Sequence, residues 1–276
     1  MLSIVIPTFN SQRHVRRCLD SILGQTYRDW EVVVKDGGST DGTVEIVKDI
    51  AAADGRVVLC EGRDAGVYDA YNQGLARARG HWLLFLGSDD ELYAPTTLAE
   101  IAPYLVEDYD LVYGNVLMCG DTTWAKSGTV FDGEYSLAKL GRQNISHQAV
   151  FYHRDLFSRF GHYDLRFKVL ADWAFNLRVF RHCRRKYVET IVARFHAGGL
   201  STQRRDEEFQ NHYFDLVREC FDFAPLHPFF STYASLLPHL ATSLRRQRRY
   251  GRALQYWLLH FLHASLLPWK RRLLGG

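Results

Sequence analysis

The sequence predicts an α/β fold in which a mostly parallel sheet is flanked by helices. Short apolar runs of strand length alternate with segments whose apolar residues recur at helical spacing. The runs are continuously apolar, which is typical of strands buried on both faces of a parallel sheet. Polar loops that carry glycine follow the strands, and in such sheets ligands bind just beyond the carboxyl ends of the strands.

The first half of the chain alternates strands and helices in the order expected for a doubly wound sheet. Its predicted strands cover residues 2–7, 30–35, 57–60 and 81–86. We expect Pro7 to end the first strand, because proline cannot donate a backbone hydrogen bond. The apolar faces of the three intervening helices are formed by Val15, Leu19, Ile22 and Leu23, by Val44, Val47 and Ala51, and by Val67, Tyr71, Leu75 and Ala78.

The second half is less regular. Strands are predicted over residues 110–115, 145–152 and 187–193, and a helix that opens at 170–173 continues through Leu177 and Phe180. From residue 205 onward the apolar residues follow helical spacing. We therefore predict an α/β domain over residues 1–204, with halves 1–115 and 116–204, and a helical extension over residues 205–276.

Composition and charge exclude several classes of protein. The 276 residues are 47% hydrophobic and 24% charged, which is typical of a globular protein and not of a disordered one. A net charge of +3 is too small to indicate nucleic-acid binding. The five cysteines are odd in number and form no C-x-x-C pair, so neither a disulfide framework nor a zinc site is predicted. With no predicted signal peptide, we expect a reducing, cytoplasmic location.

The carboxyl-terminal extension is basic. No acidic residue follows Asp222, and residues 253–269 carry no charge. That uncharged stretch is shorter than the roughly 20 residues of a membrane-spanning helix. It fits an interfacial helix on the inner face of the cell membrane, whereas a helix packed on the main domain with solvated arginines is the alternative. The flanking basic residues are Arg245, Arg246, Arg248, Arg249, Arg252, Lys270, Arg271 and Arg272.

Acidic residues follow three of the predicted strands. Asp89 and Asp90 come directly after the fourth strand, and because adjacent carboxylates repel each other, a cation or hydrogen bonds must offset that repulsion. Mg²⁺ and Mn²⁺ prefer such oxygen ligands and also bind phosphate. Asp36 and Asp64 end the second and third strands at the same edge. The four carboxylates predict a pocket for a nucleotide phosphate and a metal ion, although Asp89 and Asp90 alone are more typical of a solvated turn.

Neither G-x-G-x-x-G nor G-x-x-x-x-G-K-[ST] occurs, so no dinucleotide site or P-loop is predicted. Four segments instead resemble family 2 glycosyltransferases of the GT-A fold, in the branch that makes bacterial surface polysaccharides such as colanic acid, O-antigen and capsule. They follow the family's order and span most of residues 1–200. The segments are IVIPTFN (4–10), DGGSTDGT (36–43), DAGVYDAYNQG (64–74) and GSDD (87–90).

The resemblance implies roles for residues of the donor half. Asp89 and Asp90 match the motif that holds Mn²⁺ or Mg²⁺ on the diphosphate, although Gly87 stands where that motif has its first acidic residue. The other implied residues would lie in or near the nucleotide pocket. Pro7, Thr8 and Asn10 would line its pocket, Asp36 would contact the base, most often uracil, and Arg63 and Asp64 would lie near the base and ribose.

The resemblance also implies a general base, Asp172, at the start of a helix. A carboxylate there stays charged near the helix N-terminus and can accept the proton of an attacking hydroxyl. The alternative is a capping residue without chemistry. Trp173 is expected to pack under a sugar or in the core, and His147 and Gln148 either line the acceptor side or form a polar pair near a strand. His196, in the glycine-rich segment 194–201, is expected near the metal unless that segment is a plain loop.

Together these features predict an inverting, metal-dependent glycosyltransferase. It would move a sugar from a nucleotide-diphosphate sugar, preferably a UDP-sugar, to a hydroxyl of a saccharide or lipid-linked acceptor in cell-surface polysaccharide synthesis. A nucleotidylyltransferase is the nearest alternative, but the glycine-rich basic loop typical of that class is missing after the first strand. A non-catalytic, membrane-associated scaffold that binds sugar nucleotides is the third reading, and Asp89, Asp90 and Asp172 argue against it.

Overall fold

The structure is a computed structural model. It describes residues 1–199, 202 and 205–221 and, beyond these, residues 238, 241, 242, 245, 250, 251 and 254. Most of the predicted basic extension, including every basic residue named above except Arg245, therefore lies outside the described residues. Within the described part of the chain, no helix is long and apolar enough to cross a membrane.

The predicted alternation of strands and helices in the first half is confirmed. Four parallel strands pair in the order β3-β2-β1-β4, so their carboxyl ends meet at one edge of the sheet. The strands are β1 (Leu2–Thr8), β2 (Trp30–Asp36), β3 (Val57–Glu61) and β4 (Trp82–Phe85). The helices between them are α1 (Val15–Leu23), α2 (Thr43–Ala53) and α3 (Val67–Leu75).

The prediction that Pro7 ends the first strand is wrong, because β1 continues to Thr8. Pairing with β4 stops at Val5, which lies opposite Phe85, and Val5 accepts the hydrogen bond from Leu86 on that side. Backbone groups alternate along a strand, so the proline nitrogen faces the β4 side beyond the last paired residue. The missing N–H group therefore costs the sheet no hydrogen bond.

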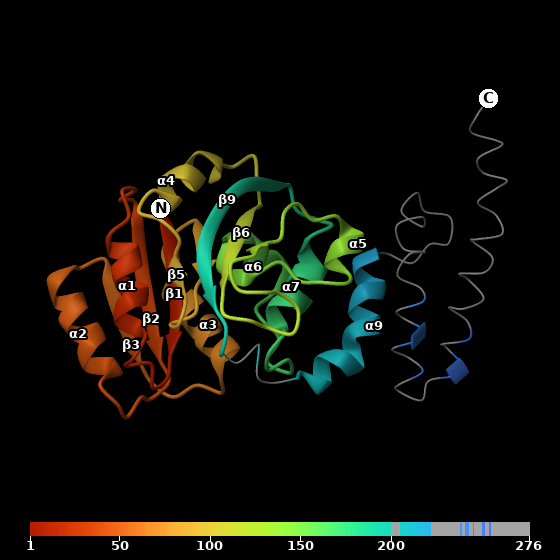
Figure 1. Cartoon of the computed structure of the whole chain (residues 1–276), viewed down its shortest axis with the longest axis horizontal. Coiled ribbons are helices and arrows are strands. Elements are labelled where there is room, and N and C mark those ends of the chain that lie inside the picture. Colours follow the sequence, from red (N-terminus) through yellow and green to blue (C-terminus); the bar gives the residue numbers. More distant parts are fainter. Residues whose placement is uncertain are drawn as a thin grey trace.

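The second half extends the same sheet with strands of mixed direction. Beyond β4 the order continues β8-β6-β9-β5, with β7 paired to β6. β6 and β9 are parallel, whereas β8 is antiparallel to both β4 and β6. Figure 1 shows β9 curving between the first half, in red to orange, and the green elements of the second half. These strands are β5 (Glu91–Leu92), β6 (Leu111–Cys119), β7 (Val130–Phe131), β8 (Val150–His153) and β9 (Arg185–His196).

Two predicted strands of this half have different limits in the structure. The strand expected over residues 145–152 begins only at Val150, because His147–Ala149 form a short 3₁₀ turn, η2. That turn directs two polar side chains away from the sheet and toward carboxylates, as described below. β9 is longer than predicted and includes Arg194, Phe195 and His196.

The sheet separates two hydrophobic cores. Successive residues of a strand point to opposite faces, so Ile4 and Ile6 pack in one core and Val5 in the other. The first core is completed by α1, α2 and α4 (Thr97–Ile101). The second is completed by α3 and by the remaining helices, which are α5 (Leu137–Leu140), α6 (Asp155–Phe160), α7 (Ala171–Val179) and α9 (Glu207–Phe221).

The first helix of the predicted extension packs on the main domain. The ring of Phe209 in α9 stacks on Trp173 of α7, with ring centroids 5.1 Å apart. Asp206 precedes α9 and is buried, and its carboxylate accepts hydrogen bonds from the backbone N–H groups of Val169, Leu170 and Phe209. One side chain therefore caps α9 and also holds the segment that leads into α7.

We expect Asp206→Ala to lower the free energy of unfolding by about 3 kcal/mol, since it leaves three backbone N–H groups without their acceptor. Urea denaturation measures the loss. Glu207→Ala is the matched control, because Glu207 is an exposed neighbour at the same helix end. Equal stability of the two variants would contradict the role given to Asp206.

Candidate active site

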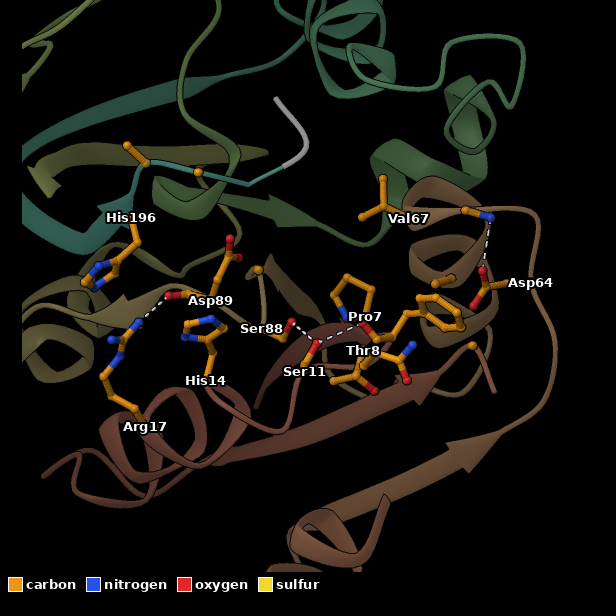
Figure 2. Close-up of a pocket in the computed structure, with 18 residues that line it drawn as sticks. Pro7, Thr8, Ser11, His14, Arg17, Asp64, Val67, Ser88, Asp89 and His196 are labelled. Atoms are coloured by element: carbon orange, nitrogen blue, oxygen red, sulfur yellow. Dashed lines mark hydrogen bonds between the residues drawn. The ribbon is translucent and has the colours of Figure 1, made fainter. Parts of the chain in front are cut away.

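A cavity of about 830 Å³ lies at the carboxyl ends of the parallel strands. Its walls come from the loops after β1, β2, β3 and β4 and from the end of β9, which is where the topology brings polar loops together. Figure 2 shows His14, Arg17, Asp89 and His196 gathered at one end and Asp64 and Val67 at the other. The predicted site residues that line this cavity are Pro7, Thr8, Asn10, Asp64, Asp89 and His196.

The loops after β1 and β2 are fastened to each other. Asn10 has a φ of 50°, in the left-handed region that asparagine tolerates better than most residues. Its side-chain oxygen accepts the backbone N–H of Thr40, and its own N–H donates to the Ser39 hydroxyl. Asn10 therefore shapes one wall of the cavity as well as lining it.

Asp36 and Arg63 do not line the cavity. Asp36 is buried, and its carboxylate accepts four hydrogen bonds: two from Ser39, one from the N–H of Gly38 and one from the Thr8 hydroxyl. Burial alone would raise the pKa of Asp36, but these hydrogen bonds more than offset it and hold the pKa below its ordinary value. The contact with a base implied for Asp36 stays a prediction.

This lowered pKa predicts an acid-sensitive loop. A carboxyl group whose pKa is depressed on folding contributes stability above its unfolded pKa of about 3.9, and that contribution is lost as pH falls through the folded value. We expect Asp36→Asn to cost about 1–3 kcal/mol at pH 7 and less as pH falls below about 4. Unfolding free energies measured across this range test the expectation, and a penalty that does not change with pH would contradict it.

Asp89 and Asp90 have different surroundings. Asp90 is buried, with one oxygen 2.7 Å from the Gln148 side-chain amide and the other 2.8 Å from the backbone N–H of His196. Burial and the charge of adjacent Asp89 raise the pKa of Asp90 to about 7. Asp89 faces the large cavity. The Asp89 carboxylate is thus the one open to a ligand, and Asp90 is the one that joins it to η2 and β9.

Glycines make room for these carboxylates. A Cβ atom on Gly87 would lie 2.7 Å from an Asp89 oxygen and 2.9 Å from an Asp90 oxygen. A Cβ atom on Gly199 would lie 2.7 Å from the other Asp89 oxygen. The space that a side chain at position 87 would need is therefore occupied by the carboxylates of Asp89 and Asp90. This explains why glycine stands where the resemblance expects an acidic residue.

We expect Gly87→Ala to weaken metal-dependent nucleotide binding about tenfold or more, because both carboxylates must move to admit the methyl group. Binding of UDP with and without Mn²⁺, measured calorimetrically, tests this. Gly55→Ala is the control, since nothing lies within 4 Å of a Cβ atom at Gly55. Unchanged binding in Gly87→Ala would show that the carboxylates do not need their present positions.

The residues present fit a divalent cation that is shared with a phosphate ligand. Within the described part of the chain, no three His, Cys, Asp or Glu side chains are grouped to hold a metal by themselves. Mg²⁺ commonly takes only one or two carboxylates and completes its shell with substrate phosphates and water. The open Asp89 carboxylate between two glycines provides that incomplete set, with Asp90 behind it. The ring of His196 lies 3.2 Å from Glu91, so its predicted metal contact stays a prediction.

Two basic residues at this end, Arg17 and His14, were not singled out by the sequence. Arg17 donates to the backbone oxygen of Asp89 at 2.6 Å, and His14 also lines the cavity. Both residues lie on or next to α1. The spacing of apolar residues in the sequence identifies only the buried face of that helix, so it does not identify these two. The ring of Phe9 also lines the cavity and is 64% exposed. An exposed aromatic ring at a cavity wall offers a flat face for stacking.

A second cavity of about 90 Å³ adjoins the first and shares Asp89, His196, Gly87 and Val67 with it. Its other walls include His147 and Gln148, which the sequence predicts either to line the acceptor side or to form a polar pair near a strand. The side-chain oxygen of Gln148 is buried there without a hydrogen-bond partner in the described part of the chain. Such an unpaired acceptor is costly unless a ligand or water donates to it.

Asp172 lies behind this second cavity and lines neither one. Its two oxygens accept hydrogen bonds from the Tyr68 hydroxyl at 2.6 Å and from the Asn144 side chain at 2.7 Å. The imidazole of His147 lies 3.6 Å from it. Burial lowers the pKa of His147, but the charge and hydrogen bond of Asp172, followed by Asp90 and Asp89, raise it above its ordinary value.

Trp173 lines neither cavity. Its indole N–H donates to the backbone oxygen of Leu140 at 2.7 Å, and its ring stacks on Phe209. Of its two predicted environments, the structure shows the packed core.

Comparisons with known proteins agree with this geometry. A family profile described as "Glycosyl transferase family 2" matches residues 3–192. A "PGL/p-HBAD biosynthesis glycosyltransferase" of Mycobacterium bovis is 46% identical over 215 residues, which cover 76% of this chain and 82% of that protein.

Solved structures are similar in fold. TarS 1-349 of S. aureus in complex with UDP-GlcNAc has a TM-score of 0.67 at 17% identity, covering 96% of this chain and 91% of that one. The mannosyltransferase PcManGT of Pyrobaculum calidifontis, in complex with GDP-Man and Mn²⁺, has a TM-score of 0.60 at 17% identity, covering 99% and 79%. At these identities the likeness shows the fold alone.

Proposed function

This chain belongs to glycosyl transferase family 2 and has the predicted GT-A fold, and from that premise we propose that it is an inverting glycosyltransferase that uses a nucleotide-diphosphate sugar and a divalent cation. Members of this family transfer glycosyl groups, so the chain is a glycosyltransferase and not a nucleotidylyltransferase. The observation that carries the proposal is the pair of adjoining cavities that meet at Asp89. One cavity suits the nucleotide diphosphate of the donor, and the other suits the acceptor hydroxyl that attacks the anomeric carbon of the donor sugar.

The large cavity supports the donor role. Asp64 lies toward the end that would receive the base and ribose, whereas Arg17 and His14 lie at the end with Asp89. The Arg17 guanidinium would offset phosphate charge by direct contact, and the His14 ring could hydrogen-bond a phosphate oxygen. Asp89, backed by Asp90, would hold Mn²⁺ or Mg²⁺, and a bound cation supplies charge neutralisation for the leaving diphosphate.

The small cavity supports transfer in a single displacement. The attacking oxygen forms a bond to the anomeric carbon while the bond from that carbon to the diphosphate oxygen breaks. The proton of the hydroxyl must leave as the new bond forms. Asp172, the predicted general base, belongs to the group of residues behind this cavity and is the carboxylate that drives removal of the proton.

A UDP-sugar is the donor we propose, and a saccharide or lipid-linked saccharide is the acceptor. A structural neighbour binds UDP-GlcNAc and another binds GDP-Man with Mn²⁺, and a relative is named for PGL/p-HBAD biosynthesis. A lipid-linked acceptor would lie at the inner face of a membrane, and the basic residues after Asp222 would be attracted to that surface. That part of the proposal rests on sequence alone, because those residues lie outside the described part of the chain.

The test is thermal stability of the full chain against UDP, GDP, dTDP, ADP and CDP, each with and without Mn²⁺. A ligand that binds only the folded protein raises the melting temperature by mass action. We expect one nucleotide, UDP, to give a shift that requires metal, and the corresponding nucleotide sugar to be turned over. A protein that responds to no nucleotide would remove the proposal, and one that binds donor but releases no nucleotide diphosphate would favour the non-catalytic scaffold.

A further inference from the structure

Residues 64–74, one of the four segments that the sequence singled out, form a loop after β3 and nearly all of α3. We propose that Tyr68 of this segment is a positioning residue for Asp172, the predicted general base, and that α3 thereby holds the base in a fixed place relative to the donor. The inference rests on the proposed function. It gives a role to a part of the segment that contacts with a nucleotide leave unexplained.

One side of this segment builds the donor cavity. Asp64, Val67 and Ala70 all line the large cavity. The loop is closed onto the helix, because the Asp69 carboxylate accepts the backbone N–H of Ala65 at 2.8 Å. The position of α3 therefore sets the position of this wall of the cavity.

The other side of α3 reaches the segment that leads into α7. The Tyr68 hydroxyl lies 2.6 Å from a carboxylate oxygen of Asp172, which is 104 positions away, and both residues are buried. One helical turn later, Asn72 exchanges two hydrogen bonds with the backbone of Tyr163, at 2.9 and 3.1 Å. The Tyr68 ring also packs edge-on against Tyr163, with centroids 5.3 Å apart. One helix thus carries a wall of the donor cavity and holds the segment that contains the base.

The Tyr68 hydroxyl is a donor and not a base. Burial, and then the charge of Asp172, raise the pKa of Tyr68 well above its ordinary value, so the hydroxyl keeps its proton. That proton has two acceptors within reach, an Asp172 oxygen at 2.6 Å and the backbone oxygen of Val169 at 2.7 Å. An ionised carboxylate is the stronger acceptor, so Tyr68 supports the charged form of Asp172, which is the form that accepts a proton. Once Asp172 is protonated, the Val169 oxygen remains as an acceptor for Tyr68.

The hydrogen bonds of Asp172 leave it able to act. One oxygen accepts from Tyr68, and the other accepts from the Asn144 side chain at 2.7 Å. The two oxygens of a carboxylate together offer about four acceptor positions, so each can still accept a further hydrogen bond. Tyr68 lines the small cavity, which places its contact with Asp172 at the wall of the cavity that suits the acceptor hydroxyl.

The reaction step balances with Asp172 as the base. The acceptor O–H gives its proton to the Asp172 carboxylate while its oxygen bonds to the anomeric carbon. The electron pair of the breaking bond leaves with the diphosphate. Tyr68 neither gains nor loses a proton in this step, and its part is to fix the direction and the charge of the carboxylate.

Other titratable groups lie around this contact, and all of them remain in the variant that tests it. His147 is one of these groups, with its Nδ1 3.6 Å from an Asp172 oxygen. The others are Tyr71 on α3, Asp89 and Asp90 after β4, Tyr152 on β8, Tyr163 before α7 and Asp206 before α9. A difference between wild type and Tyr68→Phe therefore belongs to the Tyr68 hydroxyl.

The first experiment measures the contact in the full chain without any substrate. In protein that carries ¹³C-labelled aspartate, the Asp172 carboxyl resonance is the one missing from Asp172→Asn. Its titration is compared in wild type, Tyr68→Phe and Tyr113→Phe. Phenylalanine keeps the packed ring and removes only the hydroxyl. Tyr113→Phe is the matched control, because Tyr113 is buried on β6 and its hydroxyl accepts the Tyr135 N–H at 3.0 Å, with no carboxylate in that contact.

We expect the Asp172 carboxyl to titrate at higher pH in Tyr68→Phe than in wild type, because its charged form has lost a donor. Tyr113→Phe should leave the titration in place, although it also loses one buried hydrogen bond. An Asp172 titration that is the same in Tyr68→Phe and wild type would overturn the inference.

The second experiment measures kcat and donor KM for release of nucleotide diphosphate. The donor is whichever of UDP-Glc, UDP-Gal, UDP-GlcNAc or GDP-Man stabilises the protein most with Mn²⁺, and water and octyl glycosides serve as acceptors. We expect Tyr68→Phe to lower kcat about 10–100-fold with donor KM nearly unchanged, since it loses a hydrogen bond to a charged group. Tyr113→Phe should stay within about threefold of wild type.

A double-mutant cycle shows whether Tyr68 acts through Asp172. Asp172→Asn alone should lose about 10²–10⁴ in kcat, and adding Tyr68→Phe to it should cost less than about threefold more. The same fold loss from Tyr68→Phe in both backgrounds would end the positioning role. Asp172→Asn with nearly wild-type kcat would remove Asp172 as the base and the inference with it.

Failure of the proposed function gives a different result. Wild-type protein that binds no donor and releases no nucleotide diphosphate would remove the glycosyltransferase mechanism. The carboxyl titration needs no donor, so it would still decide whether the Tyr68 hydroxyl supports the charge of Asp172.

Discussion

Replacing Asp89 with asparagine is expected to remove the metal-dependent part of donor binding. The Asp89 carboxylate is the one that faces the large cavity, between Gly87 and Gly199, whereas the Asp90 oxygens are bonded to Gln148 and His196. An amide keeps the shape of the side chain but offers a cation a neutral ligand. Loss of a residue behind a metal ligand typically costs 10–100-fold in metal affinity, so loss of the ligand should cost at least about 100-fold.

Titration calorimetry of UDP into protein with and without Mn²⁺ measures this effect. Asp49→Asn is the matched control, because Asp49 is an exposed carboxylate on α2, away from the cavity. We expect Asp89→Asn to bind UDP equally weakly under both conditions, while Asp49→Asn keeps the full response to Mn²⁺. A normal Mn²⁺ response in Asp89→Asn would show that the cation is held elsewhere.

The donor half could be predicted well because its signals are local. Continuous apolar runs and helical spacing mark β1 to β4 and the helices between them, and parallel strands necessarily bring their following loops to one edge. That is enough to place Asn10, Asp64 and Asp89 around one cavity. These local signals do not distinguish Asp36 from the residues that line the cavity. The Asp36 carboxylate accepts hydrogen bonds from the Thr8 hydroxyl and the Gly38 N–H, and Asp36 does not line the cavity.

The acceptor half could not be predicted in the same way because it is built from contacts between distant segments. Gln148 reaches Asp90 across 58 positions, and Tyr68 reaches Asp172 across 104. No periodicity encodes such pairs. The sequence 145–152 is apolar enough to suggest one strand, yet hydrogen bonds and charge draw His147 and Gln148 into a 3₁₀ turn before β8 begins. Tertiary contacts here outweigh local preference.

The second large effect is expected from Lys35→Met. The Lys35 ammonium is buried beneath the nucleotide end of the cavity, with 4% of its side chain exposed. It donates to the backbone oxygens of Asp36 at 2.7 Å and Gly62 at 2.5 Å, and it lies 3.5 Å from the carboxylate of Asp64. It thereby ties the loop after β2 to the loop after β3. Methionine keeps the length of the side chain but leaves two carbonyl groups and a half-buried carboxylate without their cation.

Removing one partner of a buried ion pair typically costs 3–5 kcal/mol, and because Asp64 is partly exposed we expect about 3 kcal/mol for Lys35→Met. Lys48→Met is the matched control. Lys48 pairs with Glu61 at 2.9 Å, but both side chains are more than half exposed, so its loss should cost under about 1 kcal/mol. Chemical denaturation measures both variants.

Steady-state kinetics of Lys35→Met distinguish the loss of the link between the loops after β2 and β3 from a general destabilisation of the protein. Since Asp64 lines the nucleotide end and takes no part in the bond changes, a displaced Asp64 should raise donor KM while leaving kcat nearly unchanged. Asp172→Asn, at the predicted general base, should show the reverse pattern, a lower kcat at constant donor KM. The two kinds of variant therefore probe the two cavities independently. A Lys35→Met protein with the stability and KM of Lys48→Met would show that these loops hold their shape without the buried lysine.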